Sequence, residues 1–230
     1  MMRKRAVVSW SGGKDSSLAL QSVLDEGELE VVSLLTTVTM TYQRISMHGV
    51  RTELLRAQQR SLDLPLFEIG IPPNCSDAAY ERALHELLRD LQADGVRDVV
   101  FGDLFLQDIR AYRQTQLAKV GMNCQFPLWG RHTGRLAQEF IDRGFKAIIV
   151  CVDPKQLDSE FCGRDFDGAL LSELPTSCDP CGERGEFHTF VHDGPIFRQP
   201  ITVSRGEIVG RQDFVFCDLI LDSAAGIATG

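Results

Sequence analysis

The chain has 230 residues, of which 43% are hydrophobic and 24% charged, an ordinary composition for a soluble globular protein with one large or two smaller α/β domains. The formal net charge of −8 argues against broad nonspecific nucleic-acid binding, which requires a basic surface. No segment approaches the roughly 20 apolar residues of a membrane helix, and the apolar run after Arg5 is too short for a signal peptide. We therefore expect a cytoplasmic protein that is not bound to a membrane.

Short apolar runs alternate with helical patterns through the first half of the chain. The predicted buried strands are residues 5–10, 31–37, 65–71 and 98–103, and the predicted helices are residues 16–24, 52–62 and 77–94. The last helix carries one apolar stripe, with Asp77 placed to cap its start and Gly95 to end it. This alternation predicts an α/β fold with a doubly wound parallel sheet that helices cover on both faces.

The second half of the chain is expected to form a smaller α+β unit. A helix over residues 133–143 and a strand over 146–152 come first, and beyond Pro175 glycine and proline become dense. The β-like runs in that part are residues 187–191, 196–203 and 213–221. We place the boundary near residue 125, which divides the chain into domains over residues 1–125 and 126–230.

A glycine-rich loop follows the first predicted strand and leads directly into a helix. Its residues are Ser11, Gly12, Gly13, Lys14, Asp15 and Ser16. This arrangement points free backbone N–H groups at an anion, and glycine lets the backbone approach phosphate oxygens closely. The loop is not a Walker motif, because Asp15 follows the lysine and the first glycine is missing. The alternative is an ordinary glycine turn before a capped helix.

The loop resembles the pyrophosphatase loop (PP-loop), SGGxDS, of ATP pyrophosphatases. The resemblance implies a Rossmann-like sheet of the HUP type with ATP and Mg²⁺ at its carboxyl edge, and cleavage of ATP between the α- and β-phosphates. A substrate oxygen would attack the α-phosphate and form an adenylate, from which a nucleophile displaces AMP. Lys14 and Asp15 would then serve in catalysis as well as in nucleotide binding.

Later motifs are similar, in their order, to those of the diphthine–ammonia ligase family, and the similarity covers nearly the whole chain. They are Gly102-Asp103 with Arg110, the segments 126–129 (FPLW), 144–147 (GFKA) and 181–190 (CGERGEFHTF), and 193–195 (DGP). The resemblance implies ATP-dependent amidation, in which a carboxylate is adenylated and then attacked by ammonium, with release of AMP and pyrophosphate. The family's acceptor is diphthine on elongation factor 2. Arg184 departs from the family pattern and leaves the charge preference for the acceptor open.

The resemblance also implies site residues at the end of the fourth strand and after the second. Gly102 would let the chain approach the nucleotide. Asp103 would bind Mg²⁺ or a ribose hydroxyl, or would simply cap a loop. His48 would lie at the edge where the nucleotide sits, or would pack at the start of a helix.

Acidic and histidine residues of the C-terminal motif are the remaining catalytic candidates. A strand through them would place Glu186, His188 and His192 on one face, with apolar residues toward the core. Glu183, Glu186 and His188 would position Mg²⁺, the carboxylate or ammonium, and would accept a proton. The alternative is a solvated polar strand face.

Two further features leave alternatives open. Arg110 and Arg113 lie one helical turn apart and would clamp phosphate or form surface ion pairs. Cys178 and Cys181 form a single CxxC pair among seven cysteines, which are expected to be reduced. The pair raises a rival function, a PP-loop sulfur transferase acting on RNA, although a structural zinc site normally needs four ligands and the negative net charge speaks against RNA. A non-catalytic nucleotide-binding module is the third possibility.

Overall fold

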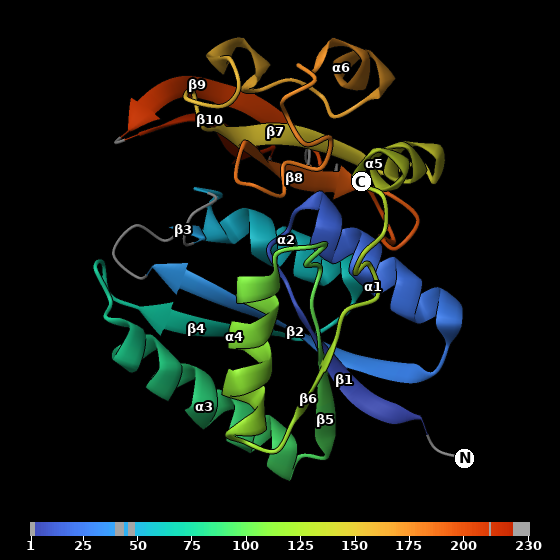
Figure 1. Cartoon of the computed structure of the whole chain (residues 1–230), viewed down its shortest axis with the longest axis vertical. Coiled ribbons are helices and arrows are strands. Elements are labelled where there is room, and N and C mark those ends of the chain that lie inside the picture. Colours follow the sequence, from blue (N-terminus) through green and yellow to red (C-terminus); the bar gives the residue numbers. More distant parts are fainter. Residues whose placement is uncertain (1–2, 40–43, 46–48, 212, 223–230) are drawn as a thin grey trace, which may run out of the picture.

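The computed structural model describes residues 3–39, 44–45, 49–211 and 213–222, so the candidate His48 lies outside the described residues. The first part of the chain forms a sheet with four helices (Figure 1). In chain order its elements are β1 (Lys4–Ser9), α1 (Lys14–Glu26), β2 (Leu29–Thr39), β3 (Arg44–Ile45), α2 (Thr52–Leu62), β4 (Leu66–Ile71), α3 (Asp77–Ala93), β5 (Val96–Val100), α4 (Gln107–Ala118) and β6 (Asn123–Gln125).

The parallel strands of this sheet run in the order β4-β2-β1-β5-β6, and β3 pairs antiparallel with the end of β2. This confirms the predicted doubly wound α/β sheet. The chain moves outward from β1 through β2 to β4 and returns on the other side of β1 as β5. The strand order therefore reverses between β1 and β5, and ligands of such sheets bind at the carboxyl ends of the strands beside that point.

The second part forms a four-stranded antiparallel sheet in the order β8-β7-β10-β9, which confirms a smaller α+β unit. Its elements are α5 (Thr133–Asp142), β7 (Lys146–Val152), η1 (Ser159–Phe161), α6 (Gly168–Glu173), β8 (Phe187–Asp193), β9 (Val203–Arg211) and β10 (Phe214–Leu221). The predicted strand over 196–203 is wrong, because β9 begins only at Val203. Pro195 and Pro200 have no N–H to donate to a ladder and keep that segment outside the sheet.

Helices α1 and α2 lie between the two sheets, and α3 and α4 cover the other face of the parallel sheet (Figure 1). One cluster of buried side chains runs from Trp10 and Leu54 in the first part to Phe140, Phe187 and Phe190 in the second. A separate cluster lies under α3. The two sheets thus share a core, and the boundary near residue 125 stays a prediction.

Ser76, the residue before the first residue of helix α3, caps the helix. The Ser76 hydroxyl accepts a hydrogen bond from the Ala79 N–H at 3.3 Å, in an extended backbone conformation. The prediction that Asp77 caps the helix is therefore wrong. Asp77 is the first helical residue, where its negative charge interacts favourably with the helix dipole.

We expect Ser76→Ala to lower the free energy of unfolding by about 1 kcal/mol, because an N-terminal N–H of α3 loses its acceptor. The matched change Asp77→Asn removes only a dipole interaction and should cost about 0.5 kcal/mol. Urea unfolding of both variants measures the difference. Equal losses would show that Ser76 does not act as the cap.

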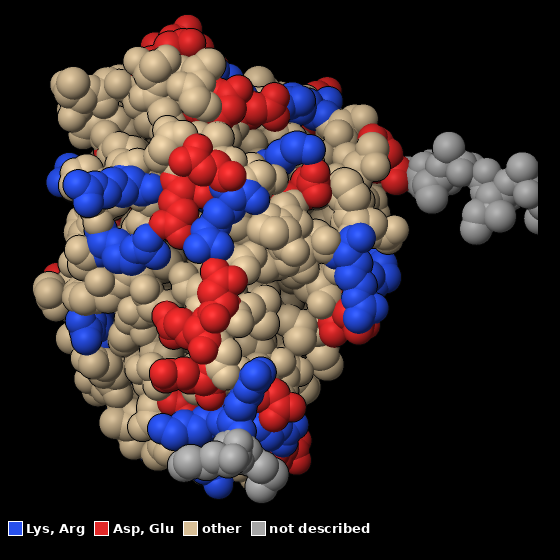
Figure 2. All heavy atoms as spheres, turned by 90° about the vertical axis from the view of Figure 1, so that its right-hand side faces the viewer, with Lys and Arg blue, Asp and Glu red and all other residues tan. Residues whose placement is uncertain are grey.

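Acidic and basic side chains alternate over the face seen in Figure 2, in keeping with the negative net charge. This mixed charge does not form the continuous basic stripe that nonspecific nucleic-acid binding needs on the face shown. Within the described ranges, each helix is too short or too polar to cross a membrane.

Candidate active site

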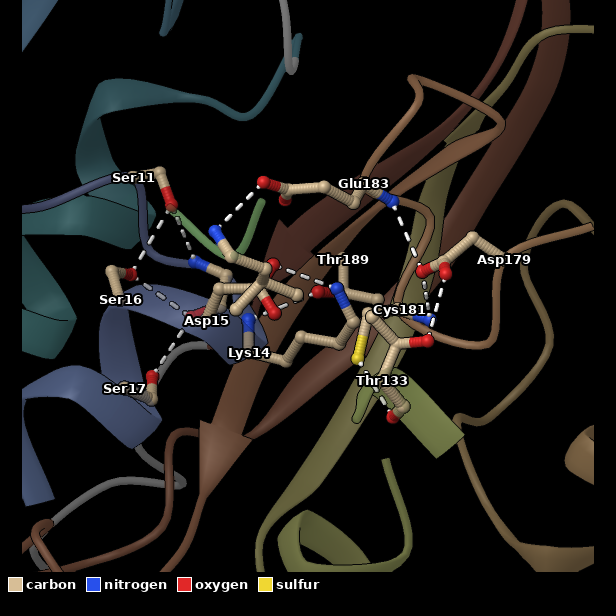
Figure 3. Close-up of polar contacts among 12 residues, drawn as sticks. Ser11, Lys14, Asp15, Ser16, Ser17, Thr133, Asp179, Cys181, Glu183 and Thr189 are labelled. Atoms are coloured by element: carbon tan, nitrogen blue, oxygen red, sulfur yellow. Dashed lines mark hydrogen bonds and ion pairs between the residues drawn. The ribbon is translucent and has the colours of Figure 1, made fainter. Parts of the chain in front are cut away.

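The glycine-rich loop lies where the strand order reverses, between the carboxyl end of β1 and the start of α1. Helix α1 begins at Lys14, and the hydroxyls of Ser16 and Ser17 donate to the Gly13 carbonyl at 2.9 and 3.0 Å. The hydroxyls of Ser11 and Ser16 lie 3.1 Å apart (Figure 3). The loop is thus held by its own serines, and the first turn of α1 opens toward the carboxyl edge of the sheet.

A buried glutamine on α2 holds this loop from behind. The Gln58 amide nitrogen donates to the carbonyls of Gly12 at 2.9 Å and Val191 at 2.7 Å, and its oxygen accepts from the Trp10 indole at 2.9 Å. Gly12 has a φ of +76°, and a Cβ there would lie 2.7 Å from the Gln58 side-chain oxygen. Only glycine fits this turn. Sequence reasoning missed Gln58, whose one signal was a polar residue on the apolar stripe of a helix.

Strand β8 of the second sheet also binds the loop. The Thr189 hydroxyl accepts from the Lys14 backbone N–H at 3.1 Å, and the Val191 N–H donates to the Gly12 carbonyl at 2.9 Å. The first N–H groups of a helix have no partner within the helix. Thr189 therefore satisfies one of them in α1, and the position of the loop depends on the C-terminal sheet.

The Lys14 side chain turns away from the loop and is buried against the second sheet. Its ammonium lies 2.7 Å from Asp15 Oδ2 and 5.5 Å from the centre of the Phe187 ring. Burial alone would lower the pKa of Lys14, but the neighbouring carboxylate and, more weakly, Cys181 and Glu183 raise it. Burial raises the pKa of Asp15, against the effect of Lys14. Asp15 Oδ1 is buried without a hydrogen-bond partner among the described residues.

The end of β5 meets the start of α1 at Gly102. A Cβ on Gly102 would lie 2.8 Å from the Asp15 carbonyl carbon, so glycine here permits a close approach of two backbones. The Asp103 carboxylate binds Arg113 through two hydrogen bonds of 2.6 and 3.0 Å. Of the two alternatives for Arg113, a phosphate clamp or an ion pair, the structure shows the ion pair. Asp103 is therefore already paired, and its role as a Mg²⁺ ligand stays a prediction.

Glu183 reaches across from the C-terminal part to this strand end. Its Oε1 accepts from the Leu104 N–H at 2.8 Å (Figure 3). Burial raises the pKa of Glu183 to about 7, supported by the negative charge of Asp15 and opposed by the Leu104 hydrogen bond and by Lys14. A carboxyl group with this pKa exchanges a proton near neutral pH, as a general base requires.

Two other carboxylates shape the loop that carries Glu183. Asp179 Oδ1 accepts from the Cys181 N–H at 2.8 Å, and its Oδ2 accepts from the Thr133 hydroxyl at 2.8 Å. Glu186 accepts from the N–H groups of Asp179 at 2.8 Å and Arg184 at 2.9 Å. Asp179 was not predicted as a support of the site, because Thr133 becomes its neighbour only in the fold.

The predicted strand face with Glu186, His188 and His192 is wrong at its first member. Glu186 precedes β8 and is buried, with both oxygens bound to backbone N–H groups. The pairing of β7 with β8 also shifts register at both ends of β8, which breaks simple alternation. Phe187 and Val191 are buried in the core as predicted.

A cavity of about 440 Å³ brings most of the candidates together. Those lining it are Ser11, Gly13, Lys14, Asp15, Ser16, Gly102, Asp103, Glu183 and His188. Glu186 is not among the lining residues. The two aromatic residues of the segment 126–129 lie behind one wall: Phe126 stacks on Phe101 at 5.5 Å, and the Arg110 guanidinium lies 4.5 Å from the centre of the Trp129 ring.

The two cysteines of the CxxC pair are buried free thiols. Burial raises the pKa of Cys178 to about 12 and also raises that of Cys181, whose thiol donates to the Thr133 carbonyl at 3.3 Å. Among the described residues, no cluster of three or more His, Cys, Asp or Glu side chains could hold a metal ion. The pair therefore resembles neither a zinc site nor a reactive thiolate.

The doubly wound sheet with this loop at its reversal point defines an α/β protein that binds a phosphorylated ligand at the carboxyl edge. Comparison with known families makes the class specific. Residues 4–124 match the diphthamide synthase N-terminal domain, and residues 132–223 match the diphthamide synthase C-terminal domain. The chain belongs to the diphthamide synthase family.

Curated relatives agree over most of the chain. The diphthine–ammonia ligase of Bos taurus is 27% identical over 235 residues, which cover 90% of this chain and 85% of the relative. Those of Homo sapiens and Danio rerio are 26% and 24% identical and cover 90% and 92% of this chain. These similarities class the chain as an ATP-dependent, amide-forming ligase.

Proposed function

We propose that this chain activates the carboxylate of an acceptor with ATP, as an acyl-adenylate, and transfers it to ammonia with release of AMP and pyrophosphate. The acceptor of the named relatives is diphthine, and we extend that acceptor, carried on a protein, to this chain. The observation that carries the proposal is the placement of Glu183, with a pKa of about 7, in the same cavity as the phosphate loop.

The loop and its surroundings suit the triphosphate. The N-terminal turn of α1 supplies N–H groups and a positive dipole end, and the Ser11 hydroxyl can add a hydrogen bond, since those of Ser16 and Ser17 already donate to the Gly13 carbonyl. Next to this cavity is a second one of about 180 Å³, lined mainly by apolar and aromatic side chains such as Leu35, Tyr80 and Phe101. The two cavities share Ser9, Ser11, Phe101 and Arg113. A nucleotide would place its base in the apolar cavity and its phosphates at the loop.

A carboxylate is a poor electrophile because its negative charge repels nucleophiles. Transfer to the α-phosphate removes that charge and creates a good leaving group, AMP. Ammonium must lose one proton to become the attacking ammonia, and the nitrogen must lose a second proton, which a base of the protein has to take up, as the amide forms. Glu183 would accept that proton, because its pKa is about 7. Asp179 and Glu186 would hold the loop that positions Glu183.

Mg²⁺ would accompany ATP as a counter-ion of the phosphates. The two candidate carboxylates differ in their availability to a Mg²⁺ ion. Asp103 is paired with Arg113, whereas Asp15 Oδ1 has no hydrogen-bond partner among the described residues. Asp15 is therefore the better placed of the two to contact the ion. Sulfur transfer to RNA is the weaker reading, because the buried Cys178 and Cys181 thiols are poorly ionised.

The product of ATP tests this function. We expect the chain, given ATP, Mg²⁺, ammonium and elongation factor 2 carrying diphthine, to release AMP and pyrophosphate, and to form little AMP when ammonium or the acceptor is omitted. Ser11→Ala, which removes a hydroxyl from the loop, should lower the rate about fivefold to tenfold, the usual worth of one ligand hydrogen bond. Ser22→Ala, on helix α1 but outside the cavity, is the matched control. Release of ADP would overturn the α-phosphate mechanism.

A further inference from the structure

A third cavity, the β9–β10 hollow, lies beside the active site, on the face of the β9–β10 hairpin toward α2 (Figure 1). Its volume is about 420 Å³. The lining residues used below are Arg51, Glu207, Arg211, Phe216 and Asp218. They come from the segment before α2 and from the two strands, which lie over the start of α2 in Figure 1. None of the features described so far needs this hollow.

Two aromatic rings join this hollow to the reaction cavity. Phe214 lines the cavity of the phosphate loop, and Phe216 lines the hollow. They stand two residues apart on β10, hence on the same face, and their ring centres are 6.3 Å apart. An acceptor arm that crosses these rings would pass from the hollow directly to the loop that holds ATP.

The hollow carries both signs of charge. Arg51 binds Asp218 through two hydrogen bonds of 3.1 and 2.6 Å, which fixes a charged pair on its floor. Glu207 and Arg211 lie at its exposed rim, and neither has an ion-pair partner in the part of the chain that the structure describes. Such a rim of mixed charge suits a protein surface, whereas RNA would favour a uniformly positive one.

The dimensions fit an extended side chain. Asp218 lies four residue steps beyond Phe214 on β10, a span of about 13 Å at the usual rise per residue. A carboxylate on an arm of this length reaches the phosphate loop while its carrier stays outside. The open rim next to Ile220, which is 44% exposed, leaves room for that carrier.

We propose that the β9–β10 hollow is the acceptor subsite: Phe214 and Phe216 guide a protein-borne carboxylate arm toward the phosphate loop, and Glu207 and Arg211 bind the carrier protein at the rim. This assignment rests on the proposed function and adds to it the place where the acceptor binds. It also explains why Gly49 faces Phe216. A Cβ on Gly49 would lie 2.7 Å from that ring and would displace it.

Charge reversal at the rim tests the subsite. In the assay with elongation factor 2 carrying diphthine, we expect Arg211→Glu and Glu207→Arg each to raise KM for the protein acceptor about tenfold, equivalent to roughly 1.4 kcal/mol. The Kd for ATP should stay within about twofold, because neither residue lines the nucleotide cavities. Arg82→Glu and Glu86→Arg, exposed on α3, are matched controls for the change of charge.

The outcomes are distinguishable. If the wild-type chain releases no AMP with this acceptor, the proposed function fails and the subsite fails with it. If the wild-type chain turns over but both rim variants keep the acceptor KM of the controls, the subsite alone is overturned. RNA binding that Arg211→Glu abolishes, with an unchanged acceptor KM, would assign the rim to RNA and overturn the proposal in the same way. Thermal unfolding of each variant checks that these exposed changes leave the fold intact.

Discussion

Glu183→Gln is expected to lower kcat for amide formation by at least about 100-fold, the lower range of the contribution of general acid–base catalysis. Glutamine keeps the shape of the side chain, and its oxygen can still accept from the Leu104 N–H, so the loop should keep its position. What is lost is the ability to take a proton. The rate of AMP release with saturating ATP, ammonium and acceptor measures the effect.

The pH profile separates this role from a structural one. Burial raises the pKa of Glu183 to about 7, so the base form increases as the pH rises through 7, and kcat should rise with it in the wild-type chain. The variant should lack that inflection. Glu173→Gln, an exposed carboxylate paired with Arg164, is the control and should behave as wild type. A Glu183→Gln enzyme with more than a third of the wild-type kcat would remove Glu183 from the mechanism.

The stability of the folded wild-type chain should fall over the pH range in which kcat rises. A carboxyl group with a raised pKa in the folded state favours the neutral form, so the folded state loses stability as the pH rises from the usual value of 4.5 to about 7. Glu183→Gln removes that charge. The variant should therefore resist urea better than the wild type at about pH 8, and the advantage should vanish below about pH 4.5.

Local patterns predicted the parallel sheet and the phosphate loop well. The strands β1, β2, β4 and β5 coincide with apolar runs in the sequence, and the loop is contiguous over residues 11–16, so neither depends on knowledge of distant contacts. The short strands β3 and β6 have no such run and were not predicted. That Glu183 belongs with the loop was implied only by the resemblance of residues 181–190 to the family motif, since the residues alone equally suit a solvated polar face. The structure places both at one cavity.

The supports of the site could not be predicted in this way. Gln58 holds Gly12 across 46 positions and Val191 across 133, and no spacing rule connects them. The chain also reverses near Glu186, where Gly182 and Gly185 adopt φ values of +65° and +88°. This turn directs the Glu186 carboxylate into the protein. A continuous strand, as predicted from the sequence, would instead have placed it on an exposed face. Alternation rules hold only within a strand, and β8 begins after Glu186.

The second large effect concerns the buried ion pair of Lys14 and Asp15. Only 4% of the Lys14 side chain is exposed, compared with 28% of the Asp15 side chain. Asp15→Asn would therefore leave a buried ammonium without a counter-charge, and we expect it to lower the free energy of unfolding by about 3 to 5 kcal/mol. Lys14→Met leaves a carboxyl group whose pKa is already raised and which can become neutral by binding a proton. Its cost should be clearly smaller.

A double-mutant cycle and a pH series test this asymmetry in the absence of nucleotide. Lys14→Met/Asp15→Asn should recover most of the stability that Asp15→Asn loses, because no buried charge remains. In Asp15→Asn, burial would lower the pKa of Lys14, so this variant should gain stability relative to the wild type as the pH rises from about 7 to about 9.5. Chemical unfolding at both pH values measures this gain. If Asp15→Asn costs no more than Lys14→Met, and its deficit does not shrink as the pH rises, then the charge of Asp15 does not stabilise the buried Lys14 ammonium.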